Sequence, residues 1–170
     1  MSDIASQRSP LYASQPAIFS HHNQLWAGTP AHFLEHLYNE FDYRADDVWL
    51  SSYPRSGTAW TYEVLYAVLY QGDIAALQQA QSAGKILKFL PIEIGSAVSV
   101  PERLNTWKAL PSPRVIPTHL PYRLYPKAVL ARHCKRVYVV RHPKDVAVSF
   151  YHHHRAQSPG TLSRDVGRLL

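Results

Sequence analysis

The feature that most constrains the fold is a strand, a turn and a helix that follow one another twice along the chain. Residues 48–53 form a short apolar run that favours a buried strand. A helical pattern follows as far as Gly72, and Glu63 is its only charge, so this helix is expected to be mostly covered. Residues 136–140 form a second run, which predicts a central parallel strand, and residues 144–154 follow as a helix. Strands that alternate with helices predict a parallel α/β sheet with right-handed crossovers.

The helical pattern after the first strand comes from apolar side chains at helical spacing. They are Trp60, Val64, Leu65, Val68 and Leu69. Residues 73–112 are broken by glycine and proline, which predicts short helices and loops, and a further strand is predicted at residues 114–116. Residues 1–30 are rich in Ser, Gln, His and Pro and predict a loose arm. Thr29 and Pro30 are suited to begin a short helix over residues 31–37.

Composition indicates a folded chain. Of its 170 residues, 46% are hydrophobic, which is within the range of roughly 45–50% for globular proteins. We expect no membrane-spanning helix, because the chain has no uncharged apolar run of about 18 residues. The polar start of the chain does not resemble a secretory signal, and the single cysteine, Cys134, excludes an internal disulfide. These observations predict a cytoplasmic protein that does not bind membranes.

Positive charge is concentrated in the second part of the chain. Residues 101–170 hold 13 of the 18 Lys and Arg side chains but only 3 of the 12 acidic ones. Such a bias indicates an anionic partner, such as a phosphorylated small molecule, or a solubilising surface. Binding to nucleic acid is not expected, because the apolar run at residues 137–140 between the basic residues is better suited to a core.

Three segments are expected to meet at one edge of the sheet, because ligands of open α/β sheets bind beyond the carboxyl ends of the strands. The first, residues 53–60, joins a strand end to a helix start, where unpaired N–H groups and the helix dipole favour an anion. Gly57 lets the backbone approach an oxyanion, Ser56 and Thr58 add hydroxyl groups, and Arg55 adds a permanent charge. The segment is not a Walker A loop. The alternative is that Ser56 only caps the helix and Arg55 is a solvated surface charge.

The other two segments supply a base and a second anion site. A neutral imidazole at His119 is suited to removing a hydroxyl proton near pH 7, although one of ten histidines can equally be a loop residue. Arg141 at a strand end can hold a second phosphate, and Ser149 can add a hydroxyl group. Lys144 and Asp145 fit an ordinary charged first turn.

Three consecutive histidines, at residues 152–154, follow on the same predicted helix. Successive side chains of a helix point about 100° apart, so these three cannot readily share one ion. We therefore expect no metal site.

Taken together, the three segments resemble blocks of the cytosolic sulfotransferase family, which transfers a sulfonate from 3′-phosphoadenosine 5′-phosphosulfate (PAPS) to an acceptor. Residues 53–60, Y-P-R-S-G-T-A-W, resemble its 5′-phosphosulfate loop, Y-P-K-S-G-T-T-W. Residues 118–121, T-H-L-P, resemble K-T-H-L-P, and residues 141–151 resemble R-N-P-K-D-V-A-V-S-Y-Y. The resemblance extends from about Asp46 to the end of the chain. It implies a three-layer α/β/α fold of the P-loop-NTPase-like type around a central parallel sheet.

The resemblance also implies roles for individual residues. His119 would be the general base, and Arg55 stands where the family has a lysine that stabilises the departing phosphate. Arg141 and Ser149 would hold the 3′-phosphate. The remaining positions of the loop would line the co-substrate: Ser56, Gly57, Thr58, Ala59 and Trp60. The implied reaction uses PAPS without a metal ion, by in-line displacement onto the hydroxyl of a small acceptor.

Four departures from the family pattern shape these expectations. Arg55 replaces the lysine, Ala59 replaces a threonine, and Pro117 replaces the lysine before the Thr-His pair. The family also continues beyond the matched segment into a G-x-x-G-x-W-K motif. We therefore expect an arm with a short helix over residues 1–45 and a partial sulfotransferase domain over residues 46–170. The alternative to an enzyme is an inactive binding or regulatory module, and a homo-oligomer is compatible with either.

Overall fold

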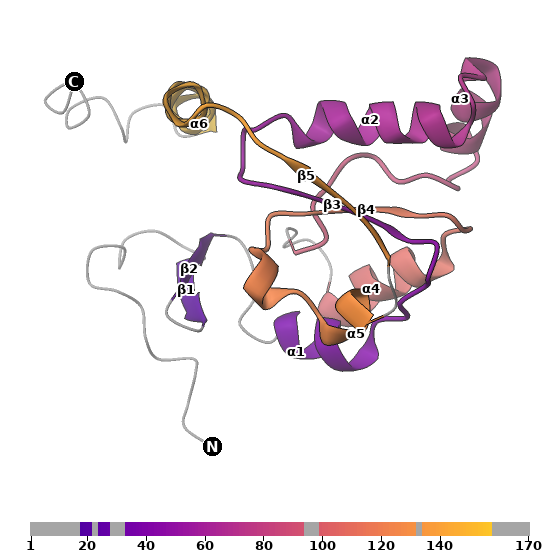
Figure 1. Ribbon diagram of the computed structural model, residues 1–170, viewed down its shortest axis with the longest axis horizontal. Coiled ribbons are helices and arrows are strands. Elements are labelled where there is room, and N and C mark those ends of the chain that lie inside the picture. The colour runs from indigo at the N-terminus through magenta and orange to yellow at the C-terminus, as the bar shows by residue number, and fades with distance from the viewer. Residues whose placement is uncertain (1–17, 22–23, 28–32, 94–98, 132–133, 158–170) are drawn as a thin grey trace, which may run out of the picture.

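Three parallel strands form the sheet that organises the molecule. The computed structural model describes residues 18–21, 24–27, 33–93, 99–131 and 134–157 (Figure 1). Strand β3 (Val48–Ser52) lies between β4 (Val115–Thr118) and β5 (Lys135–Val139). All three strands run in the same direction, and Ser51 is opposite Thr118 on one side and Tyr138 on the other. The predicted parallel α/β sheet is confirmed.

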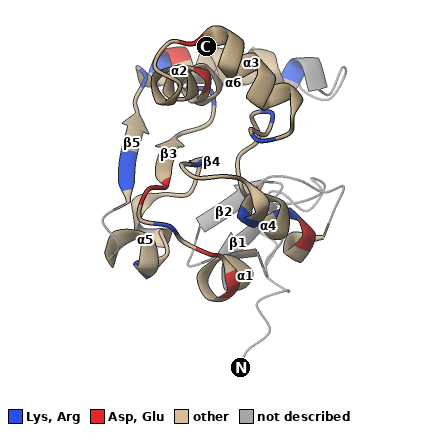
Figure 2. Cartoon of the chain, turned by 90° about the vertical axis from the view of Figure 1, so that its right-hand side faces the viewer, with Lys and Arg blue, Asp and Glu red and all other residues tan. Residues whose placement is uncertain are grey.

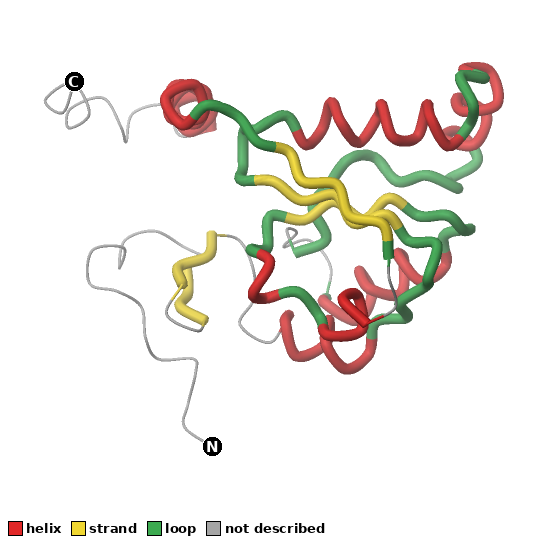
Figure 3. Tube along the Cα trace, viewed as in Figure 1, coloured by secondary structure: helices red, strands yellow, loops and turns green. Residues whose placement is uncertain are grey.

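Helices cover both faces of this sheet. Figures 1 and 3 show α2 (Thr58–Leu69), α3 (Ile74–Ser82) and α6 (Pro143–Gln157) on one side of the strands. On the other side lie α1 (Phe33–Glu40), α4 (Val100–Ala109) and α5 (Lys127–Ala131), with a 3-10 turn at Tyr122–Leu124. The architecture is therefore the expected three-layer α/β/α fold. None of the helices in the described ranges has the length and apolar character needed to cross a bilayer.

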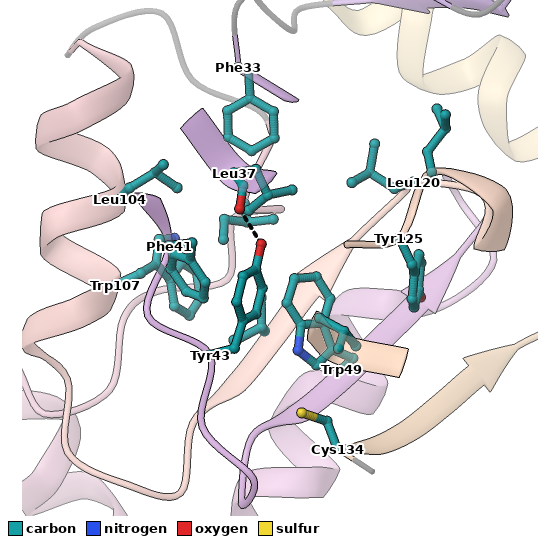
Figure 4. Close-up of a cluster of buried hydrophobic side chains, with 14 of the residues drawn as sticks. Phe33, Leu37, Phe41, Tyr43, Trp49, Leu104, Trp107, Leu120, Tyr125 and Cys134 are labelled. Carbon is teal, nitrogen blue, oxygen red and sulfur yellow. Dashed lines mark hydrogen bonds between the residues drawn. The ribbon is translucent and has the colours of Figure 1, made fainter. Parts of the chain in front are cut away.

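The side chains of β3 point alternately to the two faces of the sheet and so divide the hydrophobic core into two clusters. Side chains of a strand point to opposite faces in turn, so Trp49 faces one layer and Val48 and Leu50 face the other. Trp49 packs with the α1 and α4 side chains in the cluster of Figure 4, where the Tyr43 hydroxyl also donates to the carbonyl of Leu37. The second cluster joins β3 to α2 and α3.

Helix α2 buries only part of the stripe that the sequence predicted: Leu65 and Leu69 pack against the second cluster, but two tyrosines beside them are buried more deeply. The aromatic ring of Tyr62 is fully buried and that of Tyr66 nearly so, whereas Trp60 is 74% exposed and Val68 is 67% exposed. Both stripes have helical spacing, so spacing alone does not choose between them. The tyrosines are accommodated because their hydroxyl groups find partners: Tyr62 donates to the carbonyl of Leu87, and Tyr66 accepts from the N–H of Val115.

Strand β5 lies at an edge of the described sheet, although its apolar sequence predicted a central strand. Within the described ranges β5 pairs only with β3, and the side chains of Tyr138 and Val140 are 70% and 76% exposed. A continuous apolar run indicates burial on both faces, but it does not specify which neighbouring strand provides that burial. The central position belongs to β3.

The N-terminal arm contains structure that its composition did not predict. Strands β1 (Ile18–His21) and β2 (Gln24–Ala27) pair as an antiparallel hairpin. Helix α1 begins at Phe33 and ends at Glu40, three residues beyond the predicted end, and it buries Phe33 and Leu37. The predicted helix-capping residues, Thr29 and Pro30, lie outside the described residues.

A buried ion pair joins the starts of the two strands β3 and β4. Arg114 Nε donates to Asp47 Oδ1 at 2.8 Å and Nη2 donates to Oδ2 at 2.7 Å, with both side chains fully buried. Arg114 also donates to the carbonyls of Trp107 and Asp42, at 3.0 and 2.6 Å. This two-pronged contact fixes the register in which β3 and β4 begin, and thereby the edge at which they end.

Candidate active site

The carboxyl ends of the three strands bring the predicted site segments to one rim of the sheet. The segment after β3 becomes the turn into α2, the segment after β4 carries His119, and the segment after β5 carries Arg141. Because β3 is the middle strand, its turn lies between the other two segments. The rim is also the place where ligands of open α/β sheets bind.

The turn between β3 and α2 has the backbone of an anion cradle. Arg55 and Gly57 adopt left-handed conformations, with φ of 68° and 110°, and the N–H of Ser56 donates to the carbonyl of Tyr53 at 3.2 Å. Gly57 is the N-cap of α2 and provides no side-chain cap, and no acidic residue occupies the first turn. The N–H groups that begin a helix have no partner within it, so this helix start can accept an anion.

The side chains of this turn differ in how far they reach solvent. Ser56 and Thr58 are buried, at 7% and 3% exposed, and the Thr58 hydroxyl forms a hydrogen bond with the hydroxyl of Ser52. Ala59 and Trp60 are exposed. Thr58 therefore ties the helix start to β3, a role that the sequence did not suggest.

Two arginines connect the turn to α6. Arg141 Nη1 donates to the carbonyl of Arg55 at 3.2 Å, and Arg55 Nε donates to Ser149 Oγ at 3.2 Å. Arg55 Nη1 also lies 3.5 Å from His153 Nδ1, a residue that the sequence had not linked to the site. Both guanidinium groups are exposed. Thus three of the predicted anion ligands are neighbours: Arg55, Arg141 and Ser149. The charged groups of the two arginines face solvent.

His119 lies on the other side of the turn, against the end of β3. Its Nδ1 atom is 2.9 Å from the carbonyl oxygen of Ser52. A carbonyl oxygen only accepts hydrogen bonds, so Nδ1 carries the proton and the lone pair of a neutral ring is on Nε2. The residue is half-buried. The hydrogen bond to Ser52 gives the ring the tautomer and orientation that a general base needs.

Sequence reasoning missed a buried carboxylate beside this histidine. Glu93 is 1% exposed, its Oε1 accepts from the N–H of His119 at 2.5 Å, and its Oε2 accepts from Thr118 Oγ1 at 2.9 Å. Burial raises the pKa of the Glu93 carboxyl, and the charge of a protonated His119 and the donated hydrogen bonds oppose that rise. The signal available in the sequence was the acidic residue Glu93 directly after the apolar residues 89–92.

A groove of about 560 Å³ opens between the turn, β5 and α6. Ser56 and Arg141 contribute to its lining, which is otherwise mostly apolar and aromatic, with Tyr53, Tyr138 and Phe150 among its walls. Figure 2 shows that the basic residues of β5 lie at the start of the strand, at the opposite end from this rim. Arg141 is therefore the cation that β5 brings to the groove.

Known proteins resemble this chain in sequence. Residues 45–165 match the family model of the sulfotransferase domain. The chain is 40% identical over 125 residues to sulfotransferase 1A1 of Bos taurus and 36% identical over 134 residues to sulfotransferase 1 family member D1 of Mus musculus. These matches cover 71% and 76% of this chain but 41% and 44% of the relatives, so the chain spans less than half their length.

Solved structures give the same result for the fold. Mouse sulfotransferase SULT7A1 complexed with PAP superposes with a TM-score of 0.64 at 33% identity, over 87% of this chain and 47% of that one. Retinol dehydratase in complex with androsterone and the inactive cofactor PAP superposes with a TM-score of 0.54 at 26% identity, over 75% and 45%. Sequence and fold agree, and the chain belongs to the sulfotransferase family.

Proposed function

We propose that this chain carries the donor-binding rim and the base of a sulfotransferase that transfers a sulfonate from PAPS to a hydroxyl of a small acceptor. The observation that carries the proposal is the position of His119, whose ring is oriented by the end of the same strand that leads into the anion-binding turn. A base and an anion cradle at one rim are what sulfonate transfer to a hydroxyl requires.

The residues of the rim fit a doubly phosphorylated nucleotide. The start of α2 has no acidic residue in its first turn and has Gly57 at its N-cap, which suits the 5′-phosphosulfate end. Arg141 and Ser149 are suited to the 3′-phosphate, and they come from a different element, as two separate anionic groups require. The PAP in the similar mouse sulfotransferase supports the same ligand class. When bound, PAPS supplies a sulfonate that leaves a phosphate oxygen and bonds to the oxygen of the acceptor.

His119 would remove the proton of the acceptor hydroxyl. The lone pair of its neutral ring is on Nε2, because Nδ1 donates its proton to the carbonyl of Ser52. This contact also stabilises the imidazolium that forms when Nε2 takes the acceptor proton. The acceptor itself is proposed to be a small hydroxylated molecule, a class supported by the androsterone bound to retinol dehydratase.

Arg55 would stabilise negative charge on the departing phosphate oxygen. An arginine side chain carries a permanent positive charge, so the contribution of Arg55 is electrostatic and does not include donation of a proton. The side chain is exposed and already directed toward Ser149, at the boundary between the turn and α6. Thus Arg55 and Ser149 together would form the link between the two phosphate sites.

Titration with adenosine 3′,5′-bisphosphate, the desulfonated product, tests donor binding directly. We expect saturable heat in calorimetry and an increase of the melting temperature. Absence of both at millimolar ligand would contradict the proposal. Sulfonate transfer from PAPS to a phenol or steroid alcohol tests the reaction, and His119→Ala is expected to reduce the rate by about 10²- to 10⁴-fold, the usual contribution of a general base.

The second candidate is a binding or regulatory module without activity. It is favoured by Pro117, which replaces the lysine of the family block with a residue that carries no charge. Bisphosphate binding without any transfer that depends on His119 would support the module. Transfer that is lost in His119→Ala would exclude it.

A further inference from the structure

We infer that Glu93 is a positioning residue that holds the Thr118–His119 peptide, and with it the imidazole ring, in place. This inference depends on the proposed role of His119 as the base. It adds a residue that none of the three sequence blocks contains. Glu93 belongs to the connection that precedes α4 and is 26 positions from His119 along the chain.

The carboxylate contacts the base from the backbone side. Its Oε1 accepts from the N–H of His119 at 2.5 Å and its Oε2 accepts from the Thr118 hydroxyl at 2.9 Å. The Thr118 hydroxyl in turn accepts from the N–H of Leu120 at 3.0 Å. The carboxylate therefore holds Thr118 and His119 directly and Leu120 through the Thr118 hydroxyl, and the carbonyl of Ser52 fixes the ring of His119.

The position of Glu93 is itself defined by the sheet. The N–H of Ile92 donates to the carbonyl of Pro117 at 2.8 Å, so the chain beside Glu93 follows the outer side of β4. Glu93 and Thr118 are both buried, at 1% and 0% exposed. The carboxylate thus contacts the histidine from the protein interior. It does not lie in the groove.

Burial of the Glu93 carboxylate has a free-energy cost that its contacts must offset. Replacing buried charges with apolar side chains of similar volume is often neutral or stabilising, so an apolar side chain would fill this position of the core at a lower cost in stability. Here a second buried charge accompanies it: burial lowers the pKa of the Arg103 guanidinium on α4, and the Glu93 carboxylate opposes that shift. The Arg103 guanidinium also lies over the ring of Phe33, at 5.2 Å.

The functional consequence concerns the protonated base. When His119 takes a proton its ring becomes positive, and the Glu93 carboxylate interacts favourably with that charge through the low-dielectric interior. Glu93 is buried and is not part of the lining of the groove. It therefore acts through His119, by restricting the ring to the orientation in which Nε2 faces the rim.

Nuclear magnetic resonance on the ligand-free full chain tests the inference without requiring activity. The backbone amide proton of His119 is expected far downfield, as for an N–H bonded to a carboxylate, and its two ring nitrogens are expected to give the separate signals of a fixed Nδ1–H tautomer. In Glu93→Ala we expect the amide proton to move upfield and the ring signals to average. Glu63→Gln, an exposed acid on α2, is the matched control and should leave both unchanged.

Two further variants keep the test decisive. Glu93→Gln preserves the shape of the side chain and removes the charge, and Thr118→Val removes one of the two contacts and leaves Glu93 intact. Each is expected to shift the His119 amide. If these variants fold and all His119 signals match the wild type, the inference is wrong.

Kinetic measurements distinguish a role of Glu93 in positioning His119 from a role in stabilising the fold alone. For Glu93→Gln we expect kcat to fall by about 10- to 100-fold, the usual effect of removing an outer hydrogen-bond partner of a functional histidine, with the affinity for adenosine 3′,5′-bisphosphate unchanged. Loss of bisphosphate affinity in this variant would contradict the inference. A wild-type chain that binds no bisphosphate but shows the expected His119 signals would overturn the proposed function and leave the positioning role of Glu93 standing.

Discussion

A variant of Arg141 can test whether bisphosphate binding depends on the proposed phosphate site or only on the positive charge of the surface. It is exposed at the rim and reaches the anion-binding turn, where it donates to the carbonyl of Arg55. Hydrogen bonds to charged groups contribute about 1.5–3 kcal/mol, so Arg141→Ala is expected to weaken bisphosphate binding by this amount in calorimetry. Arg136→Ala removes the same charge from an exposed position at the other end of β5 and is the control. Equal losses in the two variants would mean that net charge alone drives binding.

Buried tyrosines determine how the chain responds to alkali. Tyr43 is 5% exposed, and burial raises the pKa of its hydroxyl far above the ordinary value of 10.0, as it also raises the pKa of the Tyr62 hydroxyl. Below pH 10 both the folded and the unfolded chain keep these protons. Above pH 10 the unfolded chain loses them and the folded chain does not, so the free energy of unfolding decreases as pH rises.

The size of this effect can be measured on one residue. Each such tyrosine contributes a slope of about 1.4 kcal/mol per pH unit once the unfolded chain has ionised. Urea titrations between pH 9 and pH 11 should show a shallower slope in Tyr43→Phe than in the wild type. Tyr53→Phe, at an exposed tyrosine, is the control and should keep the wild-type slope. An identical slope in both variants would contradict the assignment to Tyr43.

At the scale of elements, the pair Asp47–Arg114 determines how β3 and β4 meet. Both side chains are fully buried, and Arg114 contacts both carboxylate oxygens. Arg114→Met is expected to lower the free energy of unfolding by about 3–5 kcal/mol, because it leaves the Asp47 charge buried without its partner. The double variant Arg114→Met with Asp47→Leu removes both charges and should recover most of that loss in urea denaturation. A double variant less stable than the single one would show that the ion pair is not the main contribution.

The elements that the sequence predicted well are those with a local signal. The apolar runs and the turns after them located β3, β5 and α6 to within one to three residues, because proline and apolar spacing act over a few positions. The predicted buried face of α2 was only partly right: Leu65 and Leu69 pack against the core, but Trp60 and Val68 are exposed, because two stripes had the same spacing. The buried charges Arg114 and Glu93 were also missed, since their partners lie 67 and 26 positions away.

At the scale of the whole molecule, the meeting of the three segments at one rim was easier to predict than the order of the strands. The positions of Arg55, His119 and Arg141 beyond three strand ends followed from the general rule for parallel sheets, and their backbone and ring contacts bring them to one rim. The order of the strands did not follow from any local pattern. It depends on long-range pairing, such as Val48 with both Val115 and Lys135, which no short segment encodes.

The edge position of β5 has a consequence for the solution behaviour of the chain. Its first two residues, Lys135 and Arg136, are exposed charges of the kind that protects edge strands, but Tyr138 and Val140 farther along expose apolar surface beside the groove. Among the described residues no strand lies beyond β5, and apolar side chains at such an edge favour pairing with another chain, so we expect association that increases with protein concentration.

Sedimentation velocity over a range of concentrations tests this expectation with one pair of variants. Tyr138→Lys continues the charged part of β5 toward the rim and should shift the chain toward monomer, because a lysine on an edge strand opposes strand pairing. Ile74→Lys introduces the same charge at an apolar side chain that is 53% exposed at the start of α3, away from the edge, and should leave the association as in the wild type. If both variants dissociate equally, added charge is responsible and β5 is not the contact. If the wild type is a monomer at every concentration, the edge is already protected by other means.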